Sequence, residues 1–343
     1  MKYSNIIEFY PVNRTLERDI ASSLSLLDED SLKAATPDNN VTVADVFLHT
    51  RGNYEQRSFS SNVFENLSIA LKAKLTDEYR EQEPSLWAET QNRLGNILAA
   101  MGQQKHDVEL FEKAIKCFNK ALKVFNQEET PKEWAVTQSN LGTANQALGR
   151  LQEDPKLLNT AIDAYTNALL VWSRAESPED WMTTMHQLGM TLHEHGKHLK
   201  GNRQLQKAVV AYKNALAVLD ADNYAFELTA THCNRAAVLH HEAESEENPE
   251  RMIEAIKAYD KALTVCMEQQ LPFHIAVIIR VNKATAQNVL AELTSDTMLA
   301  EEVADEFELI MMCFPHALQP LCVKHCEKQL SHAKDLMSGA SAA

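Results

Sequence analysis

The sequence predicts an all-α fold, a right-handed α-solenoid of antiparallel helical hairpins, from three observations. Glycine is scarce, with 9 residues in a chain of 343, which suits helices better than sheets. Prolines recur 47 residues apart, at Pro84, Pro131 and Pro178. The same step relates other residues, namely Trp87, Trp134 and Trp181, then Gly95, Gly142 and Gly189, and then Ala114, Ala161, Ala208 and Ala255. A strict tandem repeat indicates similar units stacked in a row, each burying its neighbour's apolar face.

The first helix of each unit is predicted from its proline and its glycine. Thr130 can cap a helix that begins at Pro131, where the missing N–H costs nothing and the fixed φ is already helical. Ser177 and Pro178 repeat this arrangement one unit later. We expect this helix to run about 18 residues and to end at a glycine C-cap, with the equivalents Gly102, Gly149 and Gly196.

The second helix of each unit begins after a short loop. Asp107, Asp154 and Asn248 occupy equivalent N-cap positions, and Pro155 and Pro249 follow as first helical residues. The helix after Asp154 carries one apolar stripe at helical spacing, formed by Leu158, Ile162, Tyr165, Leu169 and Trp172. Each unit is therefore predicted to be a helical hairpin.

Small residues at fixed places predict how the two helices of a hairpin meet. Glycine in mid-helix costs about 1 kcal/mol relative to alanine. Its return at Gly95, Gly142 and Gly189, with Ala236 in the fourth unit, therefore indicates a close helix crossing. The large residue at each crossing is expected to come from the second helix, as Phe118, Tyr165, Tyr212 and Tyr259. The repeated tryptophans are expected to seat each unit on the preceding helix.

These residues resemble a known family. Leu141-Gly142 on the first helix and Ala161-x3-Tyr165-x2-Ala168 on the second are similar to the tetratricopeptide repeat, a hairpin of 34 residues. The unit of 47 residues is longer, and the added residues fall at the two ends of the hairpin. The chain looks most similar to the long bacterial variants of this repeat, through Pro131, Trp134, Ala135, Thr137, Gln138, Asn140, Leu141 and Gly142.

The repeats predict three regions along the chain. Residues 1–80 are expected to form an N-terminal helical cap region, within which residues 1–60 are either an extra cap or a separate docking element. Residues 81–313 are expected to form about five hairpins of the tetratricopeptide type, the fifth degraded because terminal repeats drift. Residues 314–343 are expected to form a C-terminal capping helix and a flexible tail.

Composition narrows the location and the class of partner. The net charge of −15 argues against a nucleic-acid partner and favours a protein partner with a basic surface. No apolar run approaches the roughly 20 residues of a membrane span. Six scattered cysteines do not indicate a disulfide scaffold, and the N-terminus lacks the apolar core of a secretory signal. We therefore expect a cytoplasmic protein without a membrane partner.

The resemblance implies a function in protein interaction. In that family the first helices line a concave groove, and one stripe of side chains on them meets the ligand. The stripe here comprises Glu89, Asn92, Asn96, Ser139, Thr143, Gln146, Thr183, His186, Met190, His193, Glu194, Cys233, His240 and His241. These positions change identity from unit to unit while their neighbours stay fixed. We expect a scaffold or adaptor that binds a peptide or helix of another protein there.

Other interpretations of the same stripe stay open at this point. Its residues are alternatively solvated surface, or the site of a sensor that binds a small ligand or a signalling peptide. Self-association through the end repeats is a further possibility. The sequence predicts no enzyme and no catalytic residue, because it has neither a Gly-rich phosphate loop nor a G-x-S-x-G nucleophile motif.

No cofactor and no metal are predicted, although the chain has two histidine-rich segments. The stretch His193–His198 is not the H-E-x-x-H of zinc proteases, because Lys197 stands where the second histidine would be. A protonation switch near pH 6 is a better hypothesis for these histidines. Whether a second cluster binds zinc stays open, with Cys313, His316, Cys322, His325 and Cys326 as its members.

Overall fold

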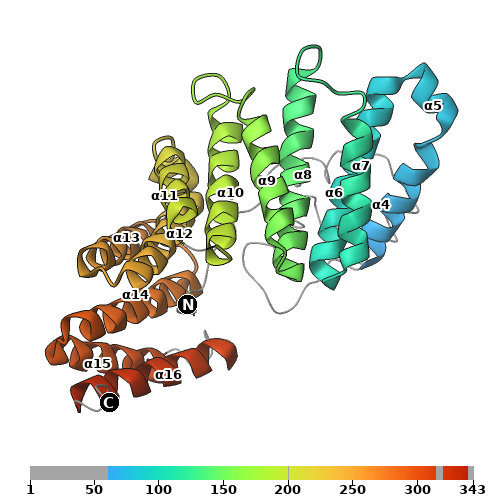
Figure 1. Cartoon of the computed structure of the whole chain (residues 1–343). Coiled ribbons are helices and arrows are strands. Elements are labelled where there is room, and N and C mark those ends of the chain that lie inside the picture. The colour runs from blue at the N-terminus through green and yellow to red at the C-terminus, as the bar shows by residue number, and fades with distance from the viewer. Residues whose placement is uncertain (1–60, 200, 314–319, 339–343) are drawn as a thin grey trace. The chain divides into compact units, whose positions relative to one another are not determined.

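The computed structural model describes residues 61–199, 201–313 and 320–338, and these residues form helices joined by short loops, without a strand (Figure 1). The prediction of an all-α fold is therefore confirmed for the described part of the chain. Its helices are α4 (Ser61–Lys74), α5 (Asp77–Gln82), α6 (Pro84–Lys105), α7 (Val108–Ala121), α8 (Pro131–Gln152), α9 (Pro155–Ala168), α10 (Pro178–Lys197), α11 (Arg203–Leu216), α12 (Ala221–Glu246), α13 (Pro249–Glu268), α14 (Phe273–Thr294), α15 (Thr297–Cys313) and α16 (Pro320–Met337).

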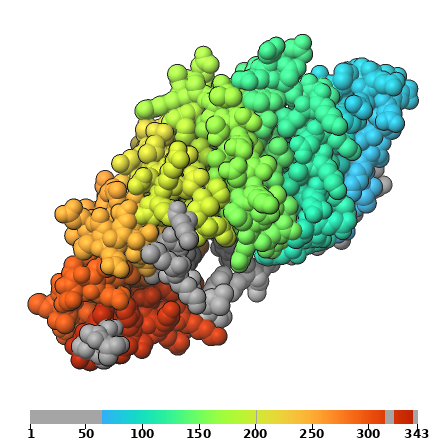
Figure 2. Space-filling model, viewed as in Figure 1, coloured from blue at the N-terminus to red at the C-terminus, as the bar shows by residue number. Residues whose placement is uncertain are grey.

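The helices form two compact units whose boundary falls inside α10, between Thr191 and Leu192. In the N-terminal unit α6 packs on α7 and α8 packs on α9, so each pair is a hairpin, and α7 also packs against α8. Figure 2 shows these helices packed side by side across the visible face. The predicted consecutive hairpins are therefore present in this unit.

The C-terminal unit continues the same order of packing. Its helices contact one another in sequence, from α11 on α12 to α15 on α16. The predicted capping helix corresponds to α16, which packs against α14 and α15. The predicted regions 1–80 and 314–343 stay predictions, because residues 1–60, 314–319 and 339–343 lie outside the described residues.

The N-caps of the second helices are as predicted. The Asp107 carboxylate accepts hydrogen bonds from the backbone N–H groups of Glu109 and Leu110, and Asp154 accepts one from Lys156. Asn248 caps α13 in the same way through the N–H of Arg251. These side chains satisfy donors that the first turn of a helix leaves without an intrahelical acceptor.

Thr130 is the N-cap residue of α8, as predicted, but without a capping hydrogen bond from its side chain. Its side chain does not cap α8; instead Thr130 Oγ1 accepts a hydrogen bond from the backbone N–H of Asn126 at 2.9 Å. Ser177 Oγ does the same with the N–H of Ser173 at 3.1 Å. Both hydroxyls therefore hold the loop that leads into the first helix, and the proline alone marks where α8 begins.

The predicted glycine C-caps were wrong. Gly149 lies inside α8, which has 22 residues, and the C-cap residue is Glu153, in the left-handed conformation with φ 53°. Gly149 is small because α9 passes close to it: a Cβ there would lie 3.0 Å from Leu158 Cδ2. Gly102 lies inside α6 in the same way, opposite Phe111. The repeated glycine therefore marks a helix contact near the end of each first helix.

The close crossing predicted at the mid-helix glycines is confirmed. A Cβ on Gly95 would lie 2.5 Å from Phe118 Cε1, and one on Gly142 would lie 2.8 Å from Tyr165 Cε1. Both aromatic rings are fully buried. The first helix of each hairpin must therefore lack a side chain at this point for the aromatic ring of the second helix to fit.

Trp134 links consecutive hairpins, as predicted. It packs against the cluster of Trp87, Ala121 and Phe125 from the preceding hairpin, and also against Ala168 and Trp172 of its own. The repeated tryptophan thus joins two apolar clusters within the N-terminal unit. Within the described residues, no helix combines the length and the apolar character needed to cross a bilayer.

Candidate functional site

The predicted stripe lies mostly inside the protein. Four of its residues are partly exposed, namely Glu89, Thr143, Thr183 and Glu194. The other ten are at most 9% exposed, namely Asn92, Asn96, Ser139, Gln146, His186, Met190, His193, Cys233, His240 and His241. The alternative that the stripe is solvated surface is therefore wrong for these ten residues. Polar atoms buried in this way must find partners inside the protein.

The contact of Asn92 with Asn140, a residue next to the stripe, shows what a buried stripe residue does in the N-terminal unit. Asn140 Nδ2 donates a hydrogen bond to Asn92 Oδ1 at 3.2 Å, and both residues are buried. The bond joins α8 to α6, two successive first helices. The stripe therefore fixes how neighbouring hairpins sit against each other.

Tyr165 of α9 joins the stripe from within its own hairpin. Its hydroxyl donates to Gln146 Oε1 at 3.1 Å and lies 3.1 Å from Thr143 Oγ1. Burial raises the pKa of Tyr165 far above its ordinary value, although Thr143 opposes the shift. The phenol is thus a neutral hydrogen-bonding group at neutral pH, and it holds the side chains of Thr143 and Gln146 in place.

In the C-terminal unit, different residues form the same kind of contact between successive first helices. His193 Nε2 lies 2.7 Å from His241 Nδ1, and both rings are buried. Asn282 Nδ2 lies 3.7 Å from Cys233 Sγ, joining α14 to α12. These bonds join successive first helices, as the one between Asn140 and Asn92 does.

The accessible members of the stripe are charged residues and hydroxyls. Glu89 forms an ion pair with Arg93 one turn further along α6. Glu194 forms one with Lys197 at 2.7 Å, also within a single helix. Thr143 donates to the backbone carbonyl of Ser139 at 3.1 Å. Each of these side chains is part of a helix surface and keeps a polar group in reach of solvent.

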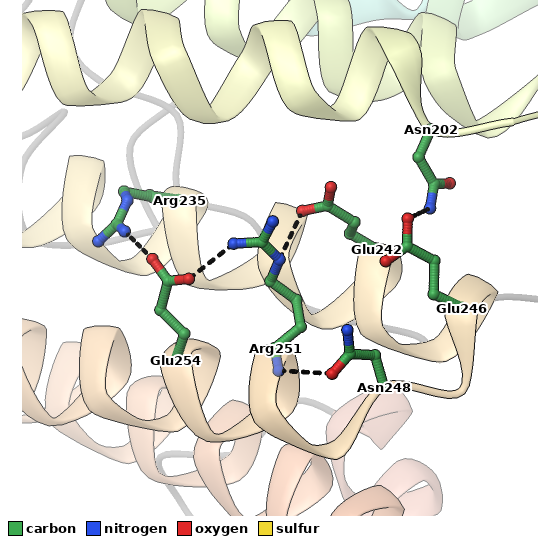
Figure 3. A network of polar contacts seen from close by, with 7 residues as sticks. All are labelled: Asn202, Arg235, Glu242, Glu246, Asn248, Arg251 and Glu254. Atoms are coloured by element: carbon green, nitrogen blue, oxygen red, sulfur yellow. Dashed lines mark hydrogen bonds and ion pairs between the residues drawn. The ribbon is translucent and has the colours of Figure 1, made fainter.

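An ionic network between α12 and α13, which we call the ionic seam, was missed by the sequence reasoning (Figure 3). Arg251 pairs with Glu242 at 3.2 Å and with Glu254 at 2.7 Å, and Arg235 pairs with the other oxygen of Glu254. The Glu242 side chain is only 1% exposed. Burial raises the pKa of Glu242, and the nearby Arg251 opposes this shift.

The signal for the ionic seam was present in the repeat. Three steps of 47 residues lead back from Arg235 to Leu94, from Glu242 to Met101 and from Arg251 to Leu110. Positions that are apolar in the first hairpin are thus charged in the fourth. A comparison of core positions between units, rather than of the stripe alone, would have found the seam.

Zinc binding by the cysteine and histidine cluster stays open; within the described residues, no group of three or more His, Cys, Asp or Glu is placed to bind a metal ion. His316 lies outside these residues. His325 Nε2 lies 2.9 Å from Thr285 Oγ1, so this ring already has a partner. Burial raises the pKa of Cys326 to about 11, which leaves a thiol at neutral pH. This arrangement gives no support to zinc binding.

A sequence profile of the tetratricopeptide repeat matches residues 87–128, which span α6 from Trp87, all of α7 and the loop that follows. The hairpin of α6 and α7 is therefore of the tetratricopeptide-repeat type. Tetratricopeptide repeats generally serve as protein-interaction modules without enzymatic activity. The 47-residue length assigned to the bacterial variant stays a prediction.

Comparison with curated proteins gives no match. Among solved structures, the chain is similar to BtubC (BKLC) from P. vanneervenii, with 16% sequence identity and a TM-score of 0.46. The match covers 75% of this chain and 94% of that one. A likeness of this size carries no argument about function, so the proposals below rest on this chain's own residues.

Proposed function

We propose that this chain is a protein-interaction scaffold that binds a peptide or helix of another protein along the stripe on its first helices. The observation that carries the proposal is the tetratricopeptide-type hairpin, repeated in order, with a stripe whose residues differ from unit to unit. Repeats keep their core residues constant and vary their binding residues, because only the binding residues must match a particular partner.

The stripe divides into two roles under this proposal. The accessible side chains of Glu89, Thr143 and Thr183, all in the N-terminal unit, contact the partner. The buried side chains hold successive first helices in register and so set the spacing of these contacts. Hydroxyl and carboxylate groups suit hydrogen bonding to an extended backbone or to basic side chains.

Charge favours a basic partner. The chain has a net charge of −15, with 48 Asp and Glu against 33 Lys and Arg. Complementary charge raises the rate at which such partners associate, and salt weakens the effect. We propose that the natural ligand carries lysine or arginine near its anchoring residues.

The test uses the full chain and a random peptide library displayed on phage. Peptides that the wild-type protein selects are labelled, and their affinity is measured by fluorescence anisotropy. The stripe variant replaces Glu89, Thr143 and Thr183 with alanine. The control variant replaces one glutamate and two threonines exposed on second helices, namely Glu112, Thr160 and Thr166.

The stripe variant is expected to lose affinity by about 10-fold or more, whereas the control variant stays within about 2-fold of wild type. Thermal melting of both variants checks that they fold. Equal affinity of both variants for every selected peptide would overturn the proposed binding surface, and so would a library from which the wild type selects nothing.

A further inference from the structure

The buried histidines of the C-terminal unit form a contact that protein binding does not explain. His193, near the end of α10, and His241, on α12, have ring centroids 4.9 Å apart with an interplanar angle of 44°. Their facing nitrogens, Nε2 and Nδ1, are 2.7 Å apart, and the residues are 1% and 2% exposed. A hydrogen bond of this length between two imidazoles connects the helices.

Such a bond limits how many protons the pair can hold. A neutral imidazole has one N–H donor and one acceptor nitrogen, and a protonated ring has two donors. The pair keeps its hydrogen bond when both rings are neutral or when one is charged. When both rings are protonated, two donors and two positive charges face each other in a buried place, and the hydrogen bond is lost.

The groups around the pair come from four helices. On α12, the His240 ring lies 5.9 Å from that of His241, and His240 Nε2 is 3.5 Å from Glu244 Oε1. On α10, Glu194 and Lys197 pair with each other. On α16, His325 is electrostatically coupled to His240, and its ring is held by Thr285 of α14.

These neighbours supply few carboxylates for the number of imidazole rings. Glu244 is one counter-charge beside three close histidine rings, with a fourth, His325, coupled to them. Lys197 already neutralises Glu194. A second proton on the pair is therefore not matched by a new anion among these groups.

We propose that the His193–His241 pair is an acid-sensitive contact between the end of α10 and α12. The contact is closed, with its hydrogen bond formed, at neutral pH, and it opens when both rings are protonated. The inference is independent of the proposed protein binding, because it concerns only the stability of this contact. Opening weakens the packing of α12 in the C-terminal unit and leaves the α6–α7 hairpin unchanged.

The direction of the pH effect follows from proton linkage. In the unfolded chain both histidines bind protons below about pH 6.5, whereas the closed pair accepts only one. The open state thus binds more protons in acid, and the contact weakens as pH falls. Burial acts in the same direction on His195 and His325, since it lowers the pKa of each.

The repeat itself suggests a neutral residue to replace His193. One step of 47 residues before His193 stands Gln146, a residue that does not titrate. The double variant His193→Gln/His241→Asn places amide groups near the positions of the two facing nitrogens and removes both proton sites. It keeps a hydrogen-bonding pair of neutral side chains between the helices.

The experiment is hydrogen–deuterium exchange of the full chain at pH 7.0 and pH 5.0, corrected for the intrinsic exchange rate at each pH. Amides of α12 are compared with those of α6, a helix without histidine. In the wild type, protection of α12 relative to α6 is expected to fall by about 10-fold at pH 5.0. In the double variant most of this loss is expected to disappear.

The proposal is overturned if the relative protection of α12 in the wild type is the same at both pH values. It is also overturned if the folded double variant loses as much protection as the wild type. A second measurement does not depend on the variant. Nitrogen-15 spectra of the imidazoles are expected to show His193 and His241 taking up fewer than two protons before α12 opens, and independent titration of both rings near pH 6.5 would exclude the pair.

Discussion

Asn140 Nδ2 donates a hydrogen bond to Asn92 Oδ1 at 3.2 Å, and the two residues are 48 positions apart in a chain whose repeat is 47. His193 and His241 are also 48 positions apart. In both pairs the side chains that meet between successive first helices are offset by one residue from equivalence, whereas Cys233 and Asn282 are offset by two. These contacts between successive first helices follow from the repeat and do not depend on one residue type.

Replacing Asn140 with alanine is expected to destabilise the protein by about 1–3 kcal/mol, because Asn92 Oδ1 stays buried without its donor. Chemical denaturation of the wild type and the variant measures the difference. Asn92→Ala and the double variant complete a cycle, in which the two single effects are expected to add to more than the double effect. Strict additivity would show that the bond contributes nothing.

The offset also explains what the sequence could and could not reveal. The hairpins were predictable, because Pro131, Gly142 and Asp154 each impose a local structure that needs no partner outside the unit. The burial of the stripe could not be predicted from the sequence. Variation between Asn92 and Ser139 suggested freedom from core constraint, whereas Asn92 pairs with Asn140, one residue beyond its equivalent.

The Gly95→Ala variant is expected to be less stable by about 1–3 kcal/mol, although alanine is the better helix former. The added Cβ would lie 2.5 Å from the Phe118 ring, which is fully buried and cannot retreat into solvent. Thermal melting measures the effect. The Phe118→Leu change is expected to cost less in the alanine variant than in the wild type, and an equal cost in both would contradict the predicted clash.

The ionic seam is expected to tolerate full replacement better than partial loss. Arg251→Leu removes the cation beside the buried Glu242 and is expected to cost about 3–5 kcal/mol. The triple variant Arg235→Leu/Glu242→Met/Arg251→Leu restores the residue types of Leu94, Met101 and Leu110 at their repeat positions. It is expected to be as stable as the wild type or more so.

Urea denaturation of both variants tests the seam. The single replacement leaves a buried carboxylate without its ion pair, whereas the triple replacement leaves no charge in the buried part of the seam (Figure 3). A triple variant less stable than Arg251→Leu would show that the network is favourable in itself. The seam would then stabilise the fourth hairpin more than an apolar contact does.

His186 predicts an acid sensitivity of the N-terminal unit that can be removed by one change. Burial lowers the pKa of His186 to about 3. The unfolded chain binds this proton below about pH 6.5, so the free energy of unfolding falls as pH drops from there toward 3. His186→Asn, the residue type of Asn92 at the same repeat position, removes this dependence.

Between pH 7 and pH 5 the His186→Asn variant is expected to lose about 2 kcal/mol less stability than the wild type. Urea denaturation at both pH values measures the two losses. The control is His198→Asn, an exposed histidine on the turn that follows α10, which is expected to behave as the wild type. Equal losses in the wild type and the His186 variant would show that a proton reaches this ring without cost.

The central claim, that a partner binds along the first helices, is tested most directly by site-specific photo-crosslinking. p-Benzoylphenylalanine replaces Glu89 or Thr183 on first helices, or Glu112 or Thr166 on second helices, and each protein is irradiated with a labelled peptide selected by the wild type. The account predicts covalent adducts from the first-helix positions and none from the second-helix positions. Adducts confined to Glu112 and Thr166 would contradict it.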